Sequence, residues 1–171
     1  MKRTNITRLC VTGLLTALVL VFTAYLHVPS YTGYTHVGDA FIYLAACLLP
    51  APHAVAVGVV GAVLADCFTG YAVWAPATAV IKAATALFFT AKASRIFAPR
   101  NRWAMLPSAA VCTGGYYLYE VLITGSFAAP LAGIAGYITQ AVLSCALFTA
   151  IAIPLDKLNF KSRFLNGGSS K

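Results

Sequence analysis

Four long apolar runs, separated by shorter polar stretches, set the pattern of this chain. The first, at 6–26, has about 20 residues and can cross a hydrocarbon core about 30 Å thick at about 1.5 Å per residue. Runs of similar length lie at 78–97, 103–124 and 130–154. Each of the four is predicted to form a membrane-spanning helix.

Two shorter apolar runs lie between the first two long ones. The run at 38–49 has about 12 residues, too few for a clean crossing, and Pro50 and Pro52 follow it. The second short run occupies 55–68. We expect these short second and third segments to form a hairpin, re-entrant or tilted, whose backbone neighbouring helices cover. The predicted fold is therefore an all-α integral membrane protein with six transmembrane helices.

The basic residues indicate the orientation of these segments. All but Lys82 fall into three clusters that flank the apolar runs: Lys2, Arg3 and Arg8; Lys92, Arg95, Arg100 and Arg102; Lys157, Lys161, Arg163 and Lys171. Because cytoplasmic loops carry an excess of Lys and Arg, both termini are predicted to lie inside. The polar and aromatic stretches at 27–37 and 67–76 then belong on the outer side.

Residues 1–165 are expected to form a single membrane domain. The remaining stretch, 166–171, reads NGGSSK, and we set it apart as a flexible tail, with a cloning remnant as one origin.

Composition agrees with the apolar pattern. The chain is 60% hydrophobic and only 9% charged, well outside the range of soluble globular domains. The formal net charge of +8 does not indicate a nucleic-acid partner, because the basic residues form no stripe with aromatic residues between them. Five cysteines are scattered singly and are interpreted as packing residues. The histidines lack metal-site spacing, and we expect neither a metal nor a cofactor.

Four charged residues interrupt the apolar segments, and they carry the main functional hypothesis. Asp39, Asp66, Lys82 and Glu120 all fall in the outer half of the predicted membrane, from four different segments. A charged side chain at that depth is tolerated when it faces a partner, a cavity or a ligand. One interpretation is therefore a substrate pocket that opens to the outside.

Polar and aromatic residues near these four charges extend the predicted pocket. Small-molecule sites are mostly apolar with a few convergent polar groups, and aromatic rings can stack on a flat ligand. A small aromatic heterocycle with several hydrogen-bond donors fits this make-up. The candidate substrate-binding residues, with the four charges included, are Tyr34, Asp39, Asp66, Tyr71, Trp74, Thr78, Lys82, Tyr116, Glu120, Tyr137 and Gln140.

Other interpretations remain open at this point. Lys82 and one acid could form a buried ion pair that fixes helix register, but one lysine cannot neutralise three acids. An intramembrane enzyme would need a nucleophile with a base within reach or clustered metal ligands, and neither a G-x-S-x-G nor a paired-acid motif such as D-x-x-D occurs. A stand-alone proton-coupled carrier of a cationic or donor-rich solute would fit the buried acids, although no inverted duplication is visible. No nucleotide-binding signature is present, so ATP-driven transport would need partner chains.

The central stretch resembles a known family of transport subunits. It combines Gly38-Asp39-Ala40, then Ala65-Asp66 with Gly70-Tyr71, then Ala75-Pro76-Ala77-Thr78, and finally Ile81-Lys82. This pattern is similar to the substrate-binding S components of energy-coupling factor (ECF) vitamin transporters, in the riboflavin-type branch. The motif covers about residues 36–85, and the length and six-helix layout of the whole chain match.

The resemblance implies a multi-pass protein of a prokaryotic plasma membrane that captures a vitamin outside. Such an S component is not an enzyme. It docks on a transmembrane scaffold subunit that is driven by two cytoplasmic ATPases, and it topples in the bilayer to release its ligand. The family's small-residue docking face on the first helix maps to Gly13, Ala17 and Ala24, although Leu20 and Val21 interrupt it. Its outer gates map to 31–36, which adds His36 to the site, and to 71–74.

The substrate follows only loosely from the resemblance and the chemistry together. Three acids and one lysine favour a donor-rich or cationic ring over an anionic one such as folate. A carboxylate such as Glu120 can pair with the amidine edge of an aminopyrimidine or a deazaguanine. Among candidate substrates we therefore rank a queuosine precursor or an aminopyrimidine highest, followed by pyridoxine and riboflavin.

Overall fold

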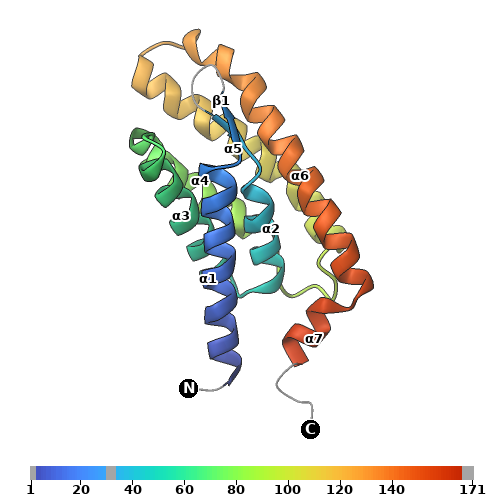
Figure 1. The fold of residues 1–171 in the computed structure, drawn as a ribbon. Helices are drawn as coiled ribbons and strands as arrows, with labels where there is room; N and C mark the ends of the chain where they lie inside the picture. Colours follow the sequence, from blue (N-terminus) through green and yellow to red (C-terminus); the bar gives the residue numbers. More distant parts are fainter. Residues whose placement is uncertain (1–2, 30–33, 167–171) are drawn as a thin grey trace.

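The computed structural model of the protein describes residues 3–29 and 34–166. It is an all-α structure with one small pair of strands (Figure 1). In chain order the elements are α1 Arg3–Ala24, β1 His27–Pro29, β2 Tyr34–His36, α2 Asp39–Leu48, α3 Ala51–Phe68, η1 Ala72–Trp74, α4 Ala75–Phe88, α5 Pro99–Thr124, η2 Ala129–Gly133, α6 Ile134–Lys157 and α7 Phe160–Asn166. The tail expected at 166–171 lies outside the described residues, except that Asn166 ends α7.

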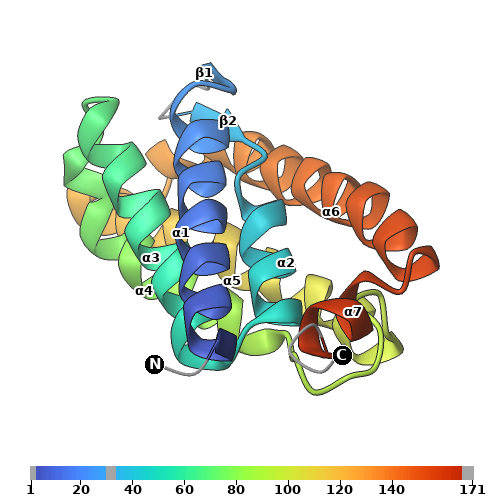
Figure 2. The same ribbon diagram turned by 60° about the horizontal axis from the view of Figure 1, so that its bottom comes forward.

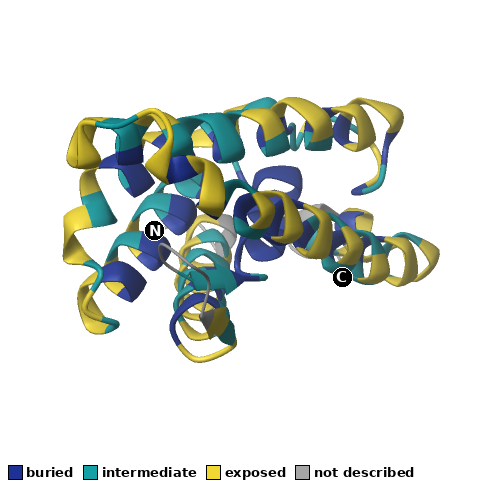
Figure 3. Ribbon diagram, turned by 90° about the horizontal axis from the view of Figure 1, so that it is seen from above, coloured by how far each residue is buried: buried dark blue, intermediate teal, exposed yellow. Residues whose placement is uncertain are grey.

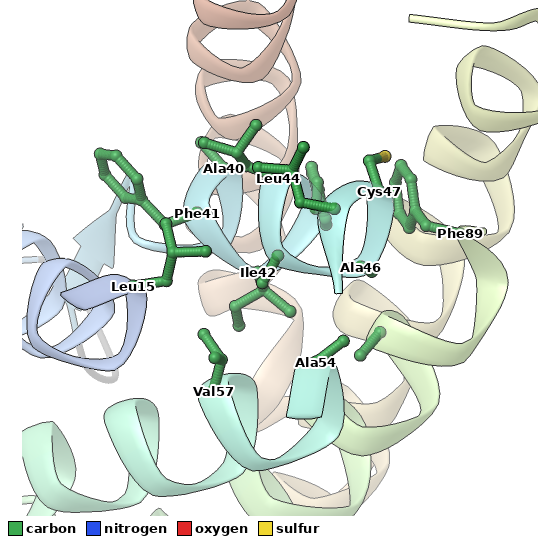
Figure 4. Close-up of a cluster of buried hydrophobic side chains, with 14 of the residues drawn as sticks. Leu15, Ala40, Phe41, Ile42, Leu44, Ala46, Cys47, Ala54, Val57 and Phe89 are labelled. Carbon is green, nitrogen blue, oxygen red and sulfur yellow. The ribbon is translucent and has the colours of Figure 1, made fainter. Parts of the chain in front are cut away.

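The short helix α2 forms the centre of the fold. All ten of its residues are buried, so it has no face left for lipid. It packs against α1, α3, α4 and α6, and Figure 2 shows it between α1 and α6. In Figure 4, Phe41 of α2 points to the side of Leu15 in α1, Ile42 points toward Val57 in α3, and Cys47 lies beside Phe89. Burial on all sides allows a helix this short to sit at membrane depth.

Of the two segments predicted to be short, only the first is short. It forms α2, whereas α3 begins at Ala51 and runs for 18 residues, so the prediction of a short third segment is wrong. Pro52 lies in the first turn of α3, where its missing N–H removes no helical hydrogen bond. The two prolines therefore mark one tight junction after α2 instead of a break before residue 55.

The predicted helix at 78–97 is wrong at both ends. α4 begins at Ala75, with Pro76 in its first turn, and ends at Phe88. Residues 89–98 form a loop whose backbone is held by side chains from later helices. Asn101 of α5 accepts a hydrogen bond from the Thr90 N–H at 2.9 Å and donates to the carbonyls of Thr90 and Ile96 at 3.1 and 3.0 Å. These partners replace the helical hydrogen bonds that the sequence pattern predicted.

Three described helices are long and apolar enough to cross a membrane: Asn5–Ala24, Ala51–Phe68 and Ala129–Lys157, the last formed by η2 and α6. Two shorter apolar helices lie at Asp39–Leu48 and Ala72–Phe88. The helical fold and its apolar character are thus confirmed. Crossing by all six segments, with both termini inside, stays a prediction.

The stretch expected to be a loop at 27–37 contains a two-stranded antiparallel sheet. β1 pairs with β2 in the register His27 to His36, and Figure 1 shows the pair at the end of the bundle away from both termini. The Thr35 hydroxyl donates to the carbonyl of Gly136 in α6 at 3.3 Å. The strands are therefore attached to the bundle at the end where the predicted site lies.

Helix α1 approaches the rest of the bundle closely because glycine faces it. A Cβ atom on Gly61 of α3 would lie 2.8 Å from Val19 and 2.9 Å from the carbonyl of Thr16. A Cβ on Gly38, just before α2, would collide with the Thr23 hydroxyl. These contacts fix α1 against α3 and set the start of α2, where Asp39 lies.

Candidate functional site

A buried ion pair lies at the base of the predicted site. Lys82 Nζ of α4 lies 2.7 Å from Asp39 Oδ1 and donates to Oδ2 at 2.9 Å, and both side chains are almost fully buried. The Gln140 amide of α6 also donates to Asp39 Oδ2, at 3.2 Å. Asp39 is the first residue of α2, so its charge also lies at the favourable end of the helix dipole. Asp39 is therefore the acid that pairs with Lys82.

Sequence reasoning missed one member of this cluster. The Cys112 thiol of α5 lies 3.8 Å from both Lys82 Nζ and Asp39 Oδ2. It was interpreted as a packing residue because it stands alone among the cysteines. Its spacing carried a usable signal, since Cys112, Tyr116 and Glu120 are four residues apart and share one face of a helix.

Asp66, near the end of α3, meets a tyrosine from the strand pair instead of a cation. The Tyr34 hydroxyl donates to Asp66 Oδ1 at 2.6 Å. The second oxygen, Oδ2, is buried and accepts no hydrogen bond from any described residue. The Thr78 hydroxyl neighbours this carboxylate without the geometry of a hydrogen bond to Oδ2. Asp66 thus retains an acceptor that a ligand donor could fill.

Glu120 of α5 is bound by another tyrosine. The Tyr137 hydroxyl of α6 donates to Glu120 Oε2 at 3.1 Å. The Tyr137 ring stacks on Tyr116, with centroids 5.5 Å apart and planes 22° from parallel. The Tyr116 hydroxyl lies 3.1 Å from the Thr78 hydroxyl, and Lys82 Nζ is 5.2 Å from the Tyr116 ring centre. The tyrosines therefore connect the acid to the ion pair through one continuous aromatic wall.

A small cavity of about 30 Å³ lies between these groups. Nine residues line it, and the sequence singled out every one: Tyr34, His36, Asp66, Tyr71, Trp74, Thr78, Tyr116, Tyr137 and Gln140. The other three predicted site residues, Asp39, Lys82 and Glu120, do not line the cavity. Asp39 and Glu120 form hydrogen bonds with residues that do, and Lys82 Nζ lies near the Tyr116 ring. The structure thus brings all twelve into one connected cluster, and their contact with a ligand stays a prediction.

The cavity is closed by residues from the strand pair and from the stretch around η1. Tyr34 packs against Tyr71 with ring centroids 4.8 Å apart, and Trp74 packs against Tyr116 at 6.0 Å. A space of about 30 Å³ holds about one or two water molecules, so a ring-sized ligand requires these side chains to move. Residues 31–33 of the expected gate lie outside the described residues.

His36 is a neutral, buried member of the lining. The Gly38 backbone N–H donates to its Nδ1 at 3.2 Å, which places the ring proton on Nε2. Burial lowers its pKa from the usual 6.5 to about 4; Asp39 opposes this shift and Lys82 reinforces it. At neutral pH, His36 therefore offers one N–H donor and carries no charge.

The expected docking residues on α1 do not share one surface. Gly13 and Ala17 are exposed, whereas Ala24 is buried with 6% of its surface exposed. The exposed face instead continues through apolar side chains, among them Ile6, Leu9, Leu14 and Val21.

A comparison with known protein families gives a match over most of the chain. A family model described as "ECF-type riboflavin transporter, S component" matches residues 3–157, which is most of the chain. The match includes the ion pair, the tyrosine-bound acids and the cavity lining. No curated protein sequence matches the chain.

Proposed function

The chain belongs to the S-component family of ECF-type transporters, and from that premise we propose that it captures a small, donor-rich aromatic heterocycle for import. The family consists of transporter binding components and not of enzymes. The cavity is the proposed capture site.

The observation that carries this proposal is the unfilled acceptor Asp66 Oδ2 at an aromatic-lined cavity. A buried carboxylate oxygen without a donor costs free energy, and a bound N–H group would remove that cost. Aromatic faces from Tyr34, Tyr71, Trp74 and Tyr116 surround the same space and suit a flat ring.

The distribution of charge favours a ligand that donates hydrogen bonds. Lys82 is engaged by Asp39, and among the described residues no Lys or Arg lines the cavity. The acids left with tyrosine partners alone are Asp66 and Glu120. An anionic ligand would face these carboxylates without a free cation. A queuosine precursor or an aminopyrimidine therefore ranks first, followed by pyridoxine and by riboflavin, the vitamin in the family's description.

Capture in this proposal begins with movement of the cover. The Tyr34 hydroxyl leaves Asp66, the strand pair and the η1 stretch separate, and the ring enters. Closure then places a ligand N–H against Asp66 and buries the ring among the tyrosines. The ion pair of Asp39 and Lys82 stays in place beneath, because Gln140 and the start of α2 hold Asp39 independently of the ligand.

The proposed topology has six crossings, with the site on the outer side and the three basic clusters inside. In that orientation the strand pair that covers the cavity lies at the end of the bundle away from the termini (Figure 1). The partners are a transmembrane scaffold and two cytoplasmic ATPases. The exposed face of α1 around Gly13 and Ala17 is the proposed scaffold contact, because a helix can approach closely over small residues.

The deciding experiment is mass spectrometry of the small molecules released when the purified, detergent-solubilised protein is denatured. We expect a stoichiometric heterocycle carrying ring N–H or amino donors. Titration of the ligand-free protein with riboflavin, pyridoxine, an aminopyrimidine and a deazaguanine then ranks affinities. Absence of any bound molecule, with no thermal shift from this panel, would contradict a capture function.

A further inference from the structure

A lateral groove between α5 and α6 is separate from the proposed capture site. Its cavity volume is about 490 Å³. One wall comes from Met105, Leu106, Ala109, Ala110 and Thr113 of α5, and the other from Ile138, Ala141, Val142 and Cys145 of α6. Small alanine side chains lie midway along it, between larger apolar ones, so the two helices leave a hollow. Figure 3, viewed from above, shows exposed positions along the outside of the bundle and buried positions toward its centre.

One end of the groove carries a positive charge. Arg102 lies at that end, and its guanidinium carbon is 5.6 Å from the centre of the Phe97 ring. It forms no ion pair with any carboxylate in the described part of the chain. A second hollow, lined by Arg102, Trp103 and Leu106, adjoins the first through Arg102 and Leu106. Trp103 is 71% exposed, as expected of a side chain at the membrane interface.

The length of the groove matches one leaflet of a bilayer. From Arg102 to Thr113 the α5 wall rises 11 residues, which is about 16 Å at about 1.5 Å per residue. Half of a hydrocarbon core about 30 Å thick is about 15 Å. Arg102 belongs to the middle basic cluster, which lies inside in the proposed topology. The groove therefore starts at the inner headgroup level and ends near the bilayer centre.

We propose that this groove binds an anionic phospholipid of the inner leaflet. The lipid phosphate lies at Arg102 beside Trp103, and one acyl chain occupies the hollow between α5 and α6. The charge selects the headgroup because no acidic residue lines either hollow. The apolar walls select a chain over a soluble anion, since a free phosphate would leave them exposed. This lipid site rests on the proposed membrane orientation of the protein, but it does not depend on which substrate the cavity captures.

Trp103 supplies a direct test. The chain has two tryptophans, so Trp74→Phe leaves Trp103 as the only fluorophore of this kind. The protein is reconstituted into vesicles that contain brominated phosphatidylglycerol or brominated phosphatidylcholine, and quenching of Trp103 gives the relative binding constant. One basic residue at a membrane surface favours an anionic lipid about fivefold, and we expect at least that preference.

Two variant pairs separate the groove from general surface attraction. Arg102→Gln should reduce the ratio of the binding constants for the two lipids to about one. Arg100→Gln removes the same charge at an exposed position outside the groove and should keep the preference for phosphatidylglycerol. Ala109→Phe fills the groove and should weaken quenching by phosphatidylglycerol. Ala146→Phe, on an exposed position of α6, should not.

Other outcomes would overturn the proposal. Equal quenching by brominated phosphatidylglycerol and brominated phosphatidylcholine would show that the site does not select an anionic lipid. If Arg102→Gln loses the preference for phosphatidylglycerol but Ala109→Phe has no effect, the preference comes from surface charge and the groove is not a lipid site. If neither Arg102→Gln nor Ala109→Phe changes the quenching of Trp103, the groove does not bind the lipid, and a protein partner becomes its expected occupant.

Discussion

The two ends of the molecule use carboxylate side chains in different ways. At the end near the termini, both oxygens of Asp156 in α6 accept backbone N–H groups, from Ile96 at 2.7 Å and Phe97 at 2.8 Å. At the other end, Asp66 and Glu120 accept single tyrosine hydroxyls, and Asp66 keeps one oxygen unfilled. A carboxylate whose two oxygens both accept backbone hydrogen bonds fixes a loop, whereas a carboxylate with a free acceptor oxygen can bind a ligand. Asp39 is the exception at the site end, because it pairs with a cation: Lys82 Nζ lies against both of its oxygens, and Gln140 donates to Oδ2.

The largest effect is expected from breaking the ion pair. Lys82→Met should lower the free energy of unfolding by about 3–5 kcal/mol, because it leaves Asp39 charged and buried without a cation. Chemical or thermal unfolding in detergent measures this loss. Adding Asp39→Asn should recover part of it.

A matched control exists at the other end of the molecule. Lys92→Met changes an exposed lysine and should stay within about 0.5 kcal/mol. If Lys82→Met is as harmless as Lys92→Met, Asp39 and Lys82 do not form a structural pair.

Acid should destabilise the site end through His36. The unfolded chain binds a proton with a pKa near 6.5, whereas the folded chain does so only near 4. Unfolding therefore takes up a proton between these values, and the His36 contribution is full above pH 6.5 and lost as pH falls to about 4. The loss amounts to about 3 kcal/mol.

Melting temperatures from pH 7.5 to pH 4 measure this dependence. His36→Gln, which cannot be protonated, should flatten the slope across that window. An unchanged slope in His36→Gln would assign the pH dependence to other groups.

Asp156→Asn should lower stability without lowering ligand affinity. An amide can accept from only one of the two backbone N–H groups, and losing a hydrogen bond to a charged group costs about 2 kcal/mol. Unfolding experiments and ligand titration on the same preparation separate the two quantities. A large loss of affinity would mean that the loop at 89–98 is coupled to the cavity.

Glu120→Gln should show the opposite pattern. We expect a loss of at least about 1.5 kcal/mol in ligand binding, roughly tenfold in Kd, because the charged hydrogen bond proposed between the ligand and Glu120 after the cover has moved becomes a neutral one. Stability should change little, since Gln can still accept from Tyr137. Asp66→Asn tests the unfilled oxygen in the same way. Unchanged affinity in both variants would remove these acids from the site.

Much of the residue cluster in and around the cavity was predictable because membrane burial makes polar residues informative. Asp39, Lys82 and Glu120 stand out in apolar sequence, and helical spacing groups Thr78 with Lys82 on one face. Cys112 was missed because a thiol looks the same in a core as in a polar cluster. Asp156 was missed because its partners are backbone groups, which carry no sequence signal.

By itself, the sequence determined the helical membrane class, the order of the segments and the residues that line the cavity. The class, the segment order and most of the lining follow from hydrophobicity and spacing, which act locally along the chain, whereas the family resemblance added His36. Only the tertiary structure decided that Lys82 pairs with Asp39, that α3 is long while α4 is short, and that two strands cover the site. Each of these depends on contacts between residues far apart in the chain, such as Lys82 with Asp39 and Tyr34 with Asp66. Pairing at that separation is set by how the helices pack, and local pattern does not encode it.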